Sequence, residues 1–358
     1  MQSVANLVNS FKENVEYRIF CGDADLNGEP LTGIVKNQWT AYNDHTKIWY
    51  AERNNLSDVL CRECDIIQPD ILFIIGLFSW HFNIVPIMFC KVAKKIISVR
   101  GMLHPGALSQ KRFKKKFFLT ALKSFGVVKK CFFHATDETE KQFIKNEFGL
   151  AAGIFVAGNF SNAIDAQLPL QKNIGSLIMG TIALISPMKN HFVVLEALKE
   201  CKAFVTYNIY GPVKDEQYWQ KCLTVISELP DNINVQYYGE TAPALVTKIL
   251  ANQHVFIMPS KSENFGHSIA EALAAARPVI TSHNTPWNNL AINNAGINTD
   301  ENPVQILNAI TFFARLNQKE YDIFVNGAKQ YSDKNIQESN TIIAYKKMFF
   351  VETANGIR

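Results

Sequence analysis

The chain has 358 residues, of which 47% are hydrophobic and 19% charged, and its formal net charge is +4 at pH 7. This composition excludes an intrinsically disordered chain, and the length favours two domains over a single core. The seven cysteines form an odd set and several lie in apolar stretches, which favours reduced thiols in a cytoplasmic protein. Cys61 and Cys64 form an isolated C-x-x-C pair, for which ordinary thiols are favoured over zinc or redox chemistry.

Apolar spacing in the first half of the chain predicts strands that alternate with helices from residue 70 onward. Helices are expected over 3–11, 56–67, 80–92, 107–125 and 138–148, and strands over 16–21, 47–51, 70–75, 95–100, 130–136 and 153–157. Such alternation predicts a parallel sheet covered on both faces. Residues 71–90 lack charged side chains, but Gly76, Asn83 and Pro86 interrupt them, so a strand and a buried helix are favoured over a membrane span.

A segment over 159–174, rich in Asn and Gln, is expected to be a linker, and the alternation restarts after it. Strands are expected over 177–185, 206–210, 233–238, 254–258 and 278–281, and helices over 191–201, 215–229, 242–252, 267–276, 302–317, 319–332 and 337–352. The expected fold class is α/β, with two Rossmann-like, doubly wound domains that face a central cleft. They occupy residues 1–158 and 175–336, and the last segment, 337–358, is expected to pack back on the first domain.

The loop before the helix at 267–276 carries the strongest signal for a ligand site. A polar run ending at Gly266 separates the end of an apolar strand from the start of this helix, which is where open α/β sheets bind ligands. Free N–H groups in the first helical turn suit an anion. Glu263 and Glu271 would lie about 12 Å apart in a continuous helix, roughly the span of a sugar diphosphate. Two ordinary helix glutamates explain this pair equally well.

Two further patterns concern metals and membranes. Asp23 and Asp25 form a D-x-D pattern, for which a turn at a strand end is favoured over a metal site. The stretch from Lys91 to Lys130 contains twelve Lys or Arg and no Asp or Glu. Within it, the run from Lys111 to Lys116 mixes basic and aromatic residues, which predicts a helix that docks peripherally on an anionic membrane surface. A solvated basic helix face is the alternative, and nucleic acid is disfavoured because no recognised binding module accompanies the patch.

Together, several segments resemble the retaining glycosyltransferases of family 4 (group 1), in the branch that builds bacterial surface polysaccharides. The segments are 98–103, 134–136, 185–190, 209–212, 238–240, 259–271 with its E-x7-E pattern, 277–280 and 285–287. The resemblance implies a GT-B fold and transfer of a hexose from a nucleotide-sugar donor to a glycan or lipid-linked acceptor, with retention of the anomeric configuration. It also implies that no metal or other cofactor is required, and that the protein is cytoplasmic or peripheral at the inner face of the membrane.

The resemblance assigns roles to individual residues. Lys189 would neutralise the donor diphosphate, Glu263 would hold hydroxyls of the transferred sugar, and Arg100 would lie near that sugar. Six further positions would bind the donor: the backbone amides of Asn264, Phe265 and Gly266, the carboxylate of Glu271 for the ribose, and Gly211 with Pro212 for the base and diphosphate.

Two departures from the family pattern leave an alternative open. Leu184 stands where most members carry an arginine, and one missing phosphate contact would cost about 2–4 kcal/mol in the transition state. We also expect the first strand and the Gly-rich turn of the first domain to be missing, because Met1 falls almost on the first helix. The alternative is a non-catalytic GT-B relative that acts as a scaffold or partner subunit in polysaccharide assembly. A sugar-nucleotide epimerase is disfavoured by the Glu-Asn-Phe-Gly loop.

Overall fold

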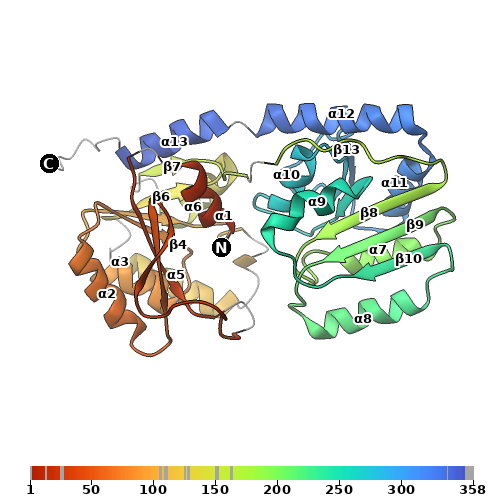
Figure 1. The fold of residues 1–358 in the computed structure, drawn as a ribbon. Coiled ribbons are helices and arrows are strands. Elements are labelled where there is room, and N and C mark those ends of the chain that lie inside the picture. Colours follow the sequence, from red (N-terminus) through yellow and green to blue (C-terminus); the bar gives the residue numbers. More distant parts are fainter. Residues whose placement is uncertain are drawn as a thin grey trace. The chain divides into compact units, whose positions relative to one another are not determined.

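The computed structural model describes residues 2–12, 14–24, 28–104, 107–108, 112–124, 126, 130–149, 153–161, 164–336 and 338–350 (Figure 1). The chain divides into two compact units, and each is described by itself. The first unit comprises Met1–Phe160 together with Glu338–Arg358, and the second comprises Ser161–Gln337. The last helix, α13 (Glu338–Phe350), therefore belongs to the first unit although it follows the second in the sequence.

The first unit contains two separate sheets. One is parallel with the order β4-β5-β6-β7, and the other has the order β1-β3-β2, in which β1 and β3 are parallel. The strands are β1 (Tyr17–Gly22), β2 (Trp39–Asn43), β3 (Thr46–Ala51), β4 (Ile71–Ile75), β5 (Lys94–Ser98), β6 (Phe132–Ala135) and β7 (Ile154–Val156). The helices are α1 (Gln2–Ser10), α2 (Leu56–Ile67), the π-helical turn η1 (Trp80–Ile84), α3 (Val85–Phe89), α5 (Arg112–Ser124), α6 (Glu138–Phe148) and α13.

The edges of β1 and β4 are open among the described residues, where β1 pairs with β3 and β4 pairs with β5. The residues of β1 are all at least partly accessible, and in β4 Ile74 alone is fully buried. Tyr17 of β1 and Phe73 of β4 nevertheless pack against one core with Leu7 of α1 and Phe349 of α13. Two open sheet edges therefore contribute side chains to one core.

The second unit contains one parallel sheet of six strands, with the order β10-β9-β8-β11-β12-β13. The strands are β8 (Ser176–Ile182), β9 (Phe204–Tyr210), β10 (Ile233–Tyr237), β11 (Val255–Met258), β12 (Val279–Ser282) and β13 (Gly296–Thr299). The helices are α7 (His191–Leu198), α8 (Glu216–Ser227), the 3-10 turn η3 (Pro243–Leu245), α9 (Val246–Ala251), α10 (His267–Ala274), α11 (Pro303–Arg315) and α12 (Gln318–Asn335). From β8 the chain adds strands in one direction, and from β11 in the other, so the strand order reverses between them.

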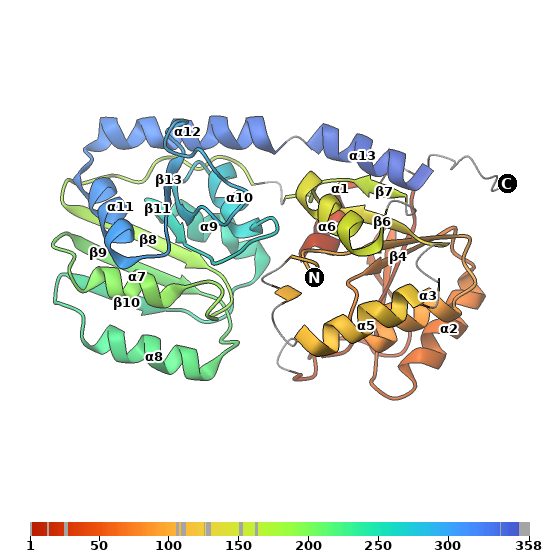
Figure 2. The same ribbon diagram turned by 180° about the vertical axis from the view of Figure 1, so that it is seen from behind.

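Helices cover both faces of this second sheet, as Figures 1 and 2 show. The helices α7, α8 and α11 enclose one core, and α9 and α10 enclose the other with part of α12. Every residue of β11 and β12 is buried as a result. Both units are therefore α/β structures built on parallel strands, and the predicted fold class is confirmed.

The segment predicted as a linker packs on the second unit. The fully buried side chain of Arg277 donates to the backbone oxygens of Leu168 at 2.6 Å, Leu250 at 2.9 Å and Gln167 at 3.4 Å. The ammonium of Lys172 donates to the backbone oxygen of Asn173 and to those of Ala314 and Leu316 at the end of α11. A buried cation without hydrogen-bond partners is costly, so these bonds hold the carbonyl groups next to it in place.

Most of the predicted helices and strands are confirmed, and the differences have physical reasons. The strands β2 and β13 were not predicted, because they are short and of mixed polarity, so that their pairing partners define them. The helix expected over 80–92 is η1 followed by α3 and ends at Phe89. Within the described part of the chain, no helix combines the length and the apolar character that crossing a bilayer requires.

Candidate functional site

The loops that follow the second-unit strands form one connected rim at the carboxyl end of the sheet. Backbone hydrogen bonds join the loop after β8 to the end of β9, from Ala183 N–H to the Tyr210 oxygen at 2.9 Å. They also join the loop after β11 to the loop after β8, from Lys261 N–H to the Met188 oxygen at 2.9 Å. The Glu263 N–H reaches the loop after β12. The rim is therefore fixed on both sides of the point where the strand order reverses, the usual ligand position in open α/β sheets.

Lys189 and Glu263 meet at this reversal point. Lys189 lies in the loop after β8 and Glu263 in the loop after β11, and the Lys189 ammonium forms an ion pair with Glu263 Oε1. The two side chains are 74 positions apart in the sequence and largely buried, with side-chain exposures of 21% and 10%. The structure thus places a cation and a hydrogen-bond acceptor side by side, where a sugar diphosphate would need both.

The loop from 259 to 266 leads directly into α10. Gly266 has φ 73° and is the residue before the first helical turn, and a Cβ there would lie 3.2 Å from the Ile269 side chain. The Trp287 indole donates to the Phe265 oxygen at 2.5 Å, and this bond fixes the loop backbone from its other side. Asn264 lies in the same loop, so the three residues whose amides were predicted to bind the donor are adjacent to the helix start.

The two glutamates of the E-x7-E pattern lie in different settings. Glu263 is in the loop, whereas Glu271 is on α10 and is 2% exposed. The helix begins at His267, so the separation calculated for a continuous helix does not apply to this pair. The assignment of Glu271 to the ribose stays a prediction.

Gly211 has a structural reason to be glycine. Its φ is 134°, and a Cβ at this position would lie 1.9 Å from the backbone oxygen of Ala183. The Gly211 N–H donates to the Gly239 oxygen at 2.7 Å, and the Pro212 oxygen accepts from the Ile185 N–H at 3.0 Å. Gly211 and Pro212 therefore hold the loops after β8, β9 and β10 against one another, on the same rim as Lys189.

An aromatic pair that the sequence analysis did not identify lies beside Gly211. The rings of Tyr210 and Tyr238 are stacked, with centroids 4.7 Å apart and planes inclined by 6°. Tyr238 is 52% exposed, so the stack is accessible to solvent at the ends of β9 and β10. The sequence contained a signal for this pair, because each tyrosine directly precedes a glycine at the end of a predicted strand.

His191 is a second residue that sequence reasoning missed. It is 1% exposed, it follows Lys189 by two positions, and its ring nitrogens have no hydrogen-bond partner among the described residues. Burial, and to a smaller extent the charge of Lys189, lowers the pKa of His191 to about 3. The imidazole is therefore neutral at pH 7, and it adds no charge beside the ion pair.

Arg100 lies in the first unit and follows β5. Its φ is 51°, its guanidinium donates to Asn159, and its Nε and Nη2 atoms are buried. Burial raises the pKa of Tyr345 in α13, and the nearby charge of Arg100 opposes that rise. The structure thus places Arg100 among side chains of the first unit, and its role near the transferred sugar stays a prediction.

Glu140 supports the same turn and was not identified from the sequence. It is 4% exposed and accepts hydrogen bonds from Gly101 N–H, from Thr136 N–H at 2.7 Å and from the Thr136 hydroxyl at 2.9 Å. One carboxylate therefore joins the turn after β5 to the end of β6. His134 of β6 is buried and accepts from or donates to Ser98 Oγ at 2.8 Å, which extends this polar cluster.

The remaining sequence motifs can be placed only in part. Asp23 of the D-x-D pattern forms an ion pair with Lys36 at 2.7 Å, and Asp25 lies outside the described residues. Across the described ranges, no group of three or more His, Cys, Asp and Glu residues could hold a metal ion. Lys111 also lies outside the described residues, whereas Lys116 is exposed on α5.

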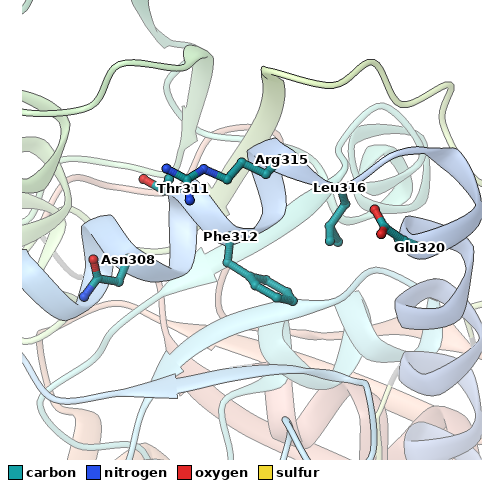
Figure 3. A pocket seen from close by; sticks show the side chains of 6 residues that line it. All are labelled: Asn308, Thr311, Phe312, Arg315, Leu316 and Glu320. Atoms are coloured by element: carbon teal, nitrogen blue, oxygen red, sulfur yellow. The ribbon is translucent and has the colours of Figure 1, made fainter.

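A hollow elsewhere on the second unit is unrelated to this rim. Figure 3 shows this pocket, which has a volume of about 390 Å³, between the end of α11 and the start of α12. Its lining is made of Asn308, Thr311, Phe312, Arg315, Leu316 and Glu320. None of the predicted site residues belongs to that lining.

The comparison with known protein families matched most of the second unit. Residues 166–331 match the family model described as glycosyl transferases group 1. This match spans β8 to β13 and contains Lys189, Glu263 and the other second-unit positions discussed above. A search of curated protein sequences found no match.

Solved structures resemble the chain over most of its length. The Anabaena protein Alr3699/HepE, in complex with UDP and glucose, has a TM-score of 0.67 at 13% identity, over 93% of this chain and 99% of that one. Sucrose-phosphate synthase from Thermosynechococcus elongatus has a TM-score of 0.69 at 12% identity, over 97% and 91%. WaaG, a glycosyltransferase involved in lipopolysaccharide biosynthesis, has a TM-score of 0.65 at 10% identity, over 96% and 94%. At such identities the likeness establishes the fold, which is GT-B.

Proposed function

We propose, from the match of residues 166–331 to the family model described as glycosyl transferases group 1, that the chain transfers a hexose from a nucleotide-sugar donor to a glycan or lipid-linked acceptor. We propose further that transfer proceeds with retention of the anomeric configuration and serves cell-surface polysaccharide synthesis. The donor binds at the rim of the second sheet. The observation that carries the proposal is the Lys189–Glu263 ion pair at the reversal point between β8 and β11.

The two charges of the pair have complementary tasks in this reaction. When the bond from the sugar to the diphosphate breaks, negative charge develops on the leaving oxygen, and the Lys189 ammonium stabilises it. Glu263, which loses its cation to the diphosphate, accepts hydrogen bonds from sugar hydroxyls instead. Because donor binding exchanges one set of charge-assisted bonds for another, neither charge is left buried without a partner.

The nucleoside part of the donor fits the aromatic pair. Tyr238 is exposed and lies on the same rim as the loop that carries Lys189, and we propose that the nucleobase stacks on its ring. The HepE structure contains UDP and glucose, and a structure of TarM from S. aureus contains UDP with alpha-GlcNAc-glycerol. These ligands support a uridine nucleotide as the first donor class to examine.

A donor screen tests the proposal. The full chain is heated with UDP-, GDP-, ADP- and CMP-sugars, and a binding nucleotide raises the unfolding midpoint by mass action. Release of nucleoside diphosphate and NMR of the sugar product then report turnover and the anomeric configuration. Absence of any stabilisation across the panel would contradict donor binding, and an inverted product would contradict retention.

A non-catalytic scaffold remains the second candidate, and two observations favour it. Leu184 lies in the loop after β8, where most glycosyltransferases of family 4 have an arginine. The strands β1 and β4 of the first unit each have an open edge among the described residues. The scaffold hypothesis predicts a folded protein that shows no transfer with any donor and acceptor. Leu184→Arg separates the candidates, because restoring the second cation should raise the turnover of an active enzyme and leave a scaffold inactive.

We also propose that α5 holds the protein on an anionic membrane surface, where lipid-linked acceptors lie. Phe113 and Phe117 are 89% and 79% exposed and lie one helical turn apart, with the exposed Lys116 beside them. Aromatic rings at the interface and a basic residue near anionic headgroups both favour binding, each basic residue by about 1 kcal/mol.

Vesicle sedimentation tests this membrane contact. Phe113→Ser with Phe117→Ser should weaken binding to vesicles containing phosphatidylglycerol, and Phe204→Ser is the matched control because Phe204 is 70% exposed on the second unit. Equal binding of both variants, or equal binding to neutral phosphatidylcholine vesicles, would contradict the role of α5.

A further inference from the structure

The rim of the second sheet carries more positive charge than the ion pair alone contains. The loops that follow β8, β9 and β11 contain three lysines and no arginine, and the lysines are Lys189, Lys214 and Lys261. Lys189 forms the ion pair with Glu263, whereas Lys214 and Lys261 are exposed to solvent. The proposed function gives a task to Lys189, and the two exposed cations have none.

Backbone hydrogen bonds hold Lys261 beside the ion pair. The Lys261 N–H donates to the backbone oxygen of Met188 at 2.9 Å, and Met188 directly precedes Lys189. Glu263 follows Lys261 by two positions, and its own N–H donates to the Asn284 oxygen at 3.1 Å. Lys261 is therefore a neighbour of Lys189 in space and of Glu263 in the sequence. Because main-chain groups fix this position, replacing the Lys261 side chain leaves the loop bonded as before.

The two exposed lysines differ in the charges around them. Lys214 is followed directly by Asp215 and Glu216, which lie at the start of α8, and their negative charges reduce the positive potential there. Lys261 is followed by an uncharged serine, and the nearby carboxylate of Glu263 is already neutralised by Lys189. A flexible stem of four carbons lets an exposed ammonium turn toward an anion. Lys261 is thus the better placed of the two to bind a phosphate at the rim.

We propose that Lys261 is a second cation for the diphosphate of the donor, an inference that rests on the proposed function. Each of the two phosphate groups in a nucleotide sugar carries a negative charge, and Lys189 supplies a single positive one. Leu184, in the loop after β8, adds no charge. When the donor binds, the Lys261 ammonium contacts the diphosphate from the loop after β11, while Lys189 contacts it from the loop after β8. The leaving group is then stabilised by cations from two loops.

Calorimetric titration with UDP, at low and at high salt, tests this contact in the full chain. Lys261→Met removes the charge and keeps most of the stem, and it should weaken UDP binding about tenfold at low salt, the size of one charge-assisted contact. The affinity should also depend less on salt, because one ionic contact has been lost. A purely structural role of the lysine would leave the salt dependence unchanged.

Lys214→Met is the matched control for the loss of a rim lysine. Lys214 is also exposed, and its N–H also donates to the loop after β8, to the Ile185 oxygen at 3.1 Å. We expect this variant to bind UDP as the unaltered chain does. Equal affinities in the two variants would overturn the inference, whether both match the unaltered chain or both are weakened, because the effect would not belong to Lys261.

The conservative replacement Lys261→Arg tests whether charge is the property that matters. It should keep the affinity for UDP and its salt dependence, and both Lys261 variants should unfold at the same temperature as the unaltered chain. A loss in Lys261→Arg as large as that in Lys261→Met would contradict a contact based on charge.

The outcome for the unaltered chain separates this inference from the proposed function. If UDP binds equally well with and without the Lys261 charge, the inference fails and the proposed function stands. If UDP does not bind, the titration uses whichever of GDP, ADP and CDP does. If none of these nucleotides binds the unaltered chain, the proposed function fails and the inference fails with it.

Discussion

The two units of this protein differ in how their strands are joined: the second unit has one continuous sheet and the first has two separate sheets. In the second unit, β8 and β11 pair directly across the point where the strand order reverses, and Lys189 and Glu263 meet above them. In the first unit, the edges of β1 and β4 remain open among the described residues, although both strands share a core with α1 and α13. The comparison teaches that direct pairing of two strands from distant parts of the chain brings the loops that follow them into contact.

The largest effect on sugar transfer is expected when one charge of the Lys189–Glu263 ion pair is removed. Lys189→Ala should lower sugar transfer by about 100- to 1,000-fold, since loss of one preorganised group at a developing oxyanion costs about 3–4 kcal/mol. Glu263→Gln should lower transfer less, because an amide still accepts a hydrogen bond from a sugar hydroxyl. Rates of nucleotide release with the best donor measure both changes.

A control distinguishes chemistry from folding in these variants. Lys199→Ala removes an exposed ion pair with Glu228 on the same unit and should leave transfer unchanged. If Lys189→Ala retained full activity while its unfolding midpoint matched that of the control, the ion pair would not be the catalytic feature.

The next effect concerns the backbone of the second-unit rim. Gly211→Ala should destabilise the protein by about 3 kcal/mol, because its Cβ would lie 1.9 Å from the Ala183 oxygen and backbone must move. Gly175→Ala is the matched control, since it also has positive φ, 83°, but nothing within 4 Å of the added carbon. That control should cost only about 1 kcal/mol. Urea unfolding gives both values, and equal losses would show that the close contact is not the cause.

The open edges of β1 and β4 in the first unit can be tested by adding a strand. A segment of five β-branched residues and a short glycine turn, fused ahead of α1, could pair with both β1 and β4. Covering roughly 100 Å² of apolar surface would stabilise the first unit by about 2 kcal/mol, as an upper estimate. Hydrogen exchange should then slow at the β1 and β4 amides.

The matched control for this extension carries two prolines within the same five positions, because proline cannot donate the ladder hydrogen bonds. Identical exchange rates in the two fusions would mean that no strand enters between β1 and β4, and that the open edges are closed in another way.

A final comparison of the units concerns their buried histidines. Burial lowers the pKa of His134 in the first unit and of His191 in the second to about 3, and that of His254 in the second to about 4. Because each unfolded histidine takes up a proton near pH 6.5, stability falls as the pH drops from about 6.5 toward these values. Each group contributes at most about 1.4 kcal/mol per pH unit.

Hydrogen exchange at pH 7 and pH 5 can measure the loss of stability in each unit separately. The second unit should lose more protection than the first, since it contains two such histidines. His134→Asn should reduce the acid sensitivity of the first unit alone. A first unit that loses protection faster than the second would contradict this account.

Much of the fold could be predicted because its signals are local. Continuous apolar strands and helical spacing gave most element positions, including the helix from Leu56 to Ile67. Short elements such as β13 escaped prediction, since Gly296 is placed by close contact with the Val279 backbone rather than by its own propensity. The candidate site was predicted from resemblance, motif by motif.

The sequence by itself determined the alternation of strands and helices, the polar loop that carries Glu263 and the cationic loop that carries Lys189. Only the tertiary structure decided that these loops touch, because 74 residues separate their ion pair and the pairing of β8 with β11 brings them together. The same holds for Cys90, whose sulfur lies 3.9 Å from that of Cys61. Spacing along a chain encodes which face a residue occupies, whereas contacts between distant segments arise from the packing of whole sheets and helices.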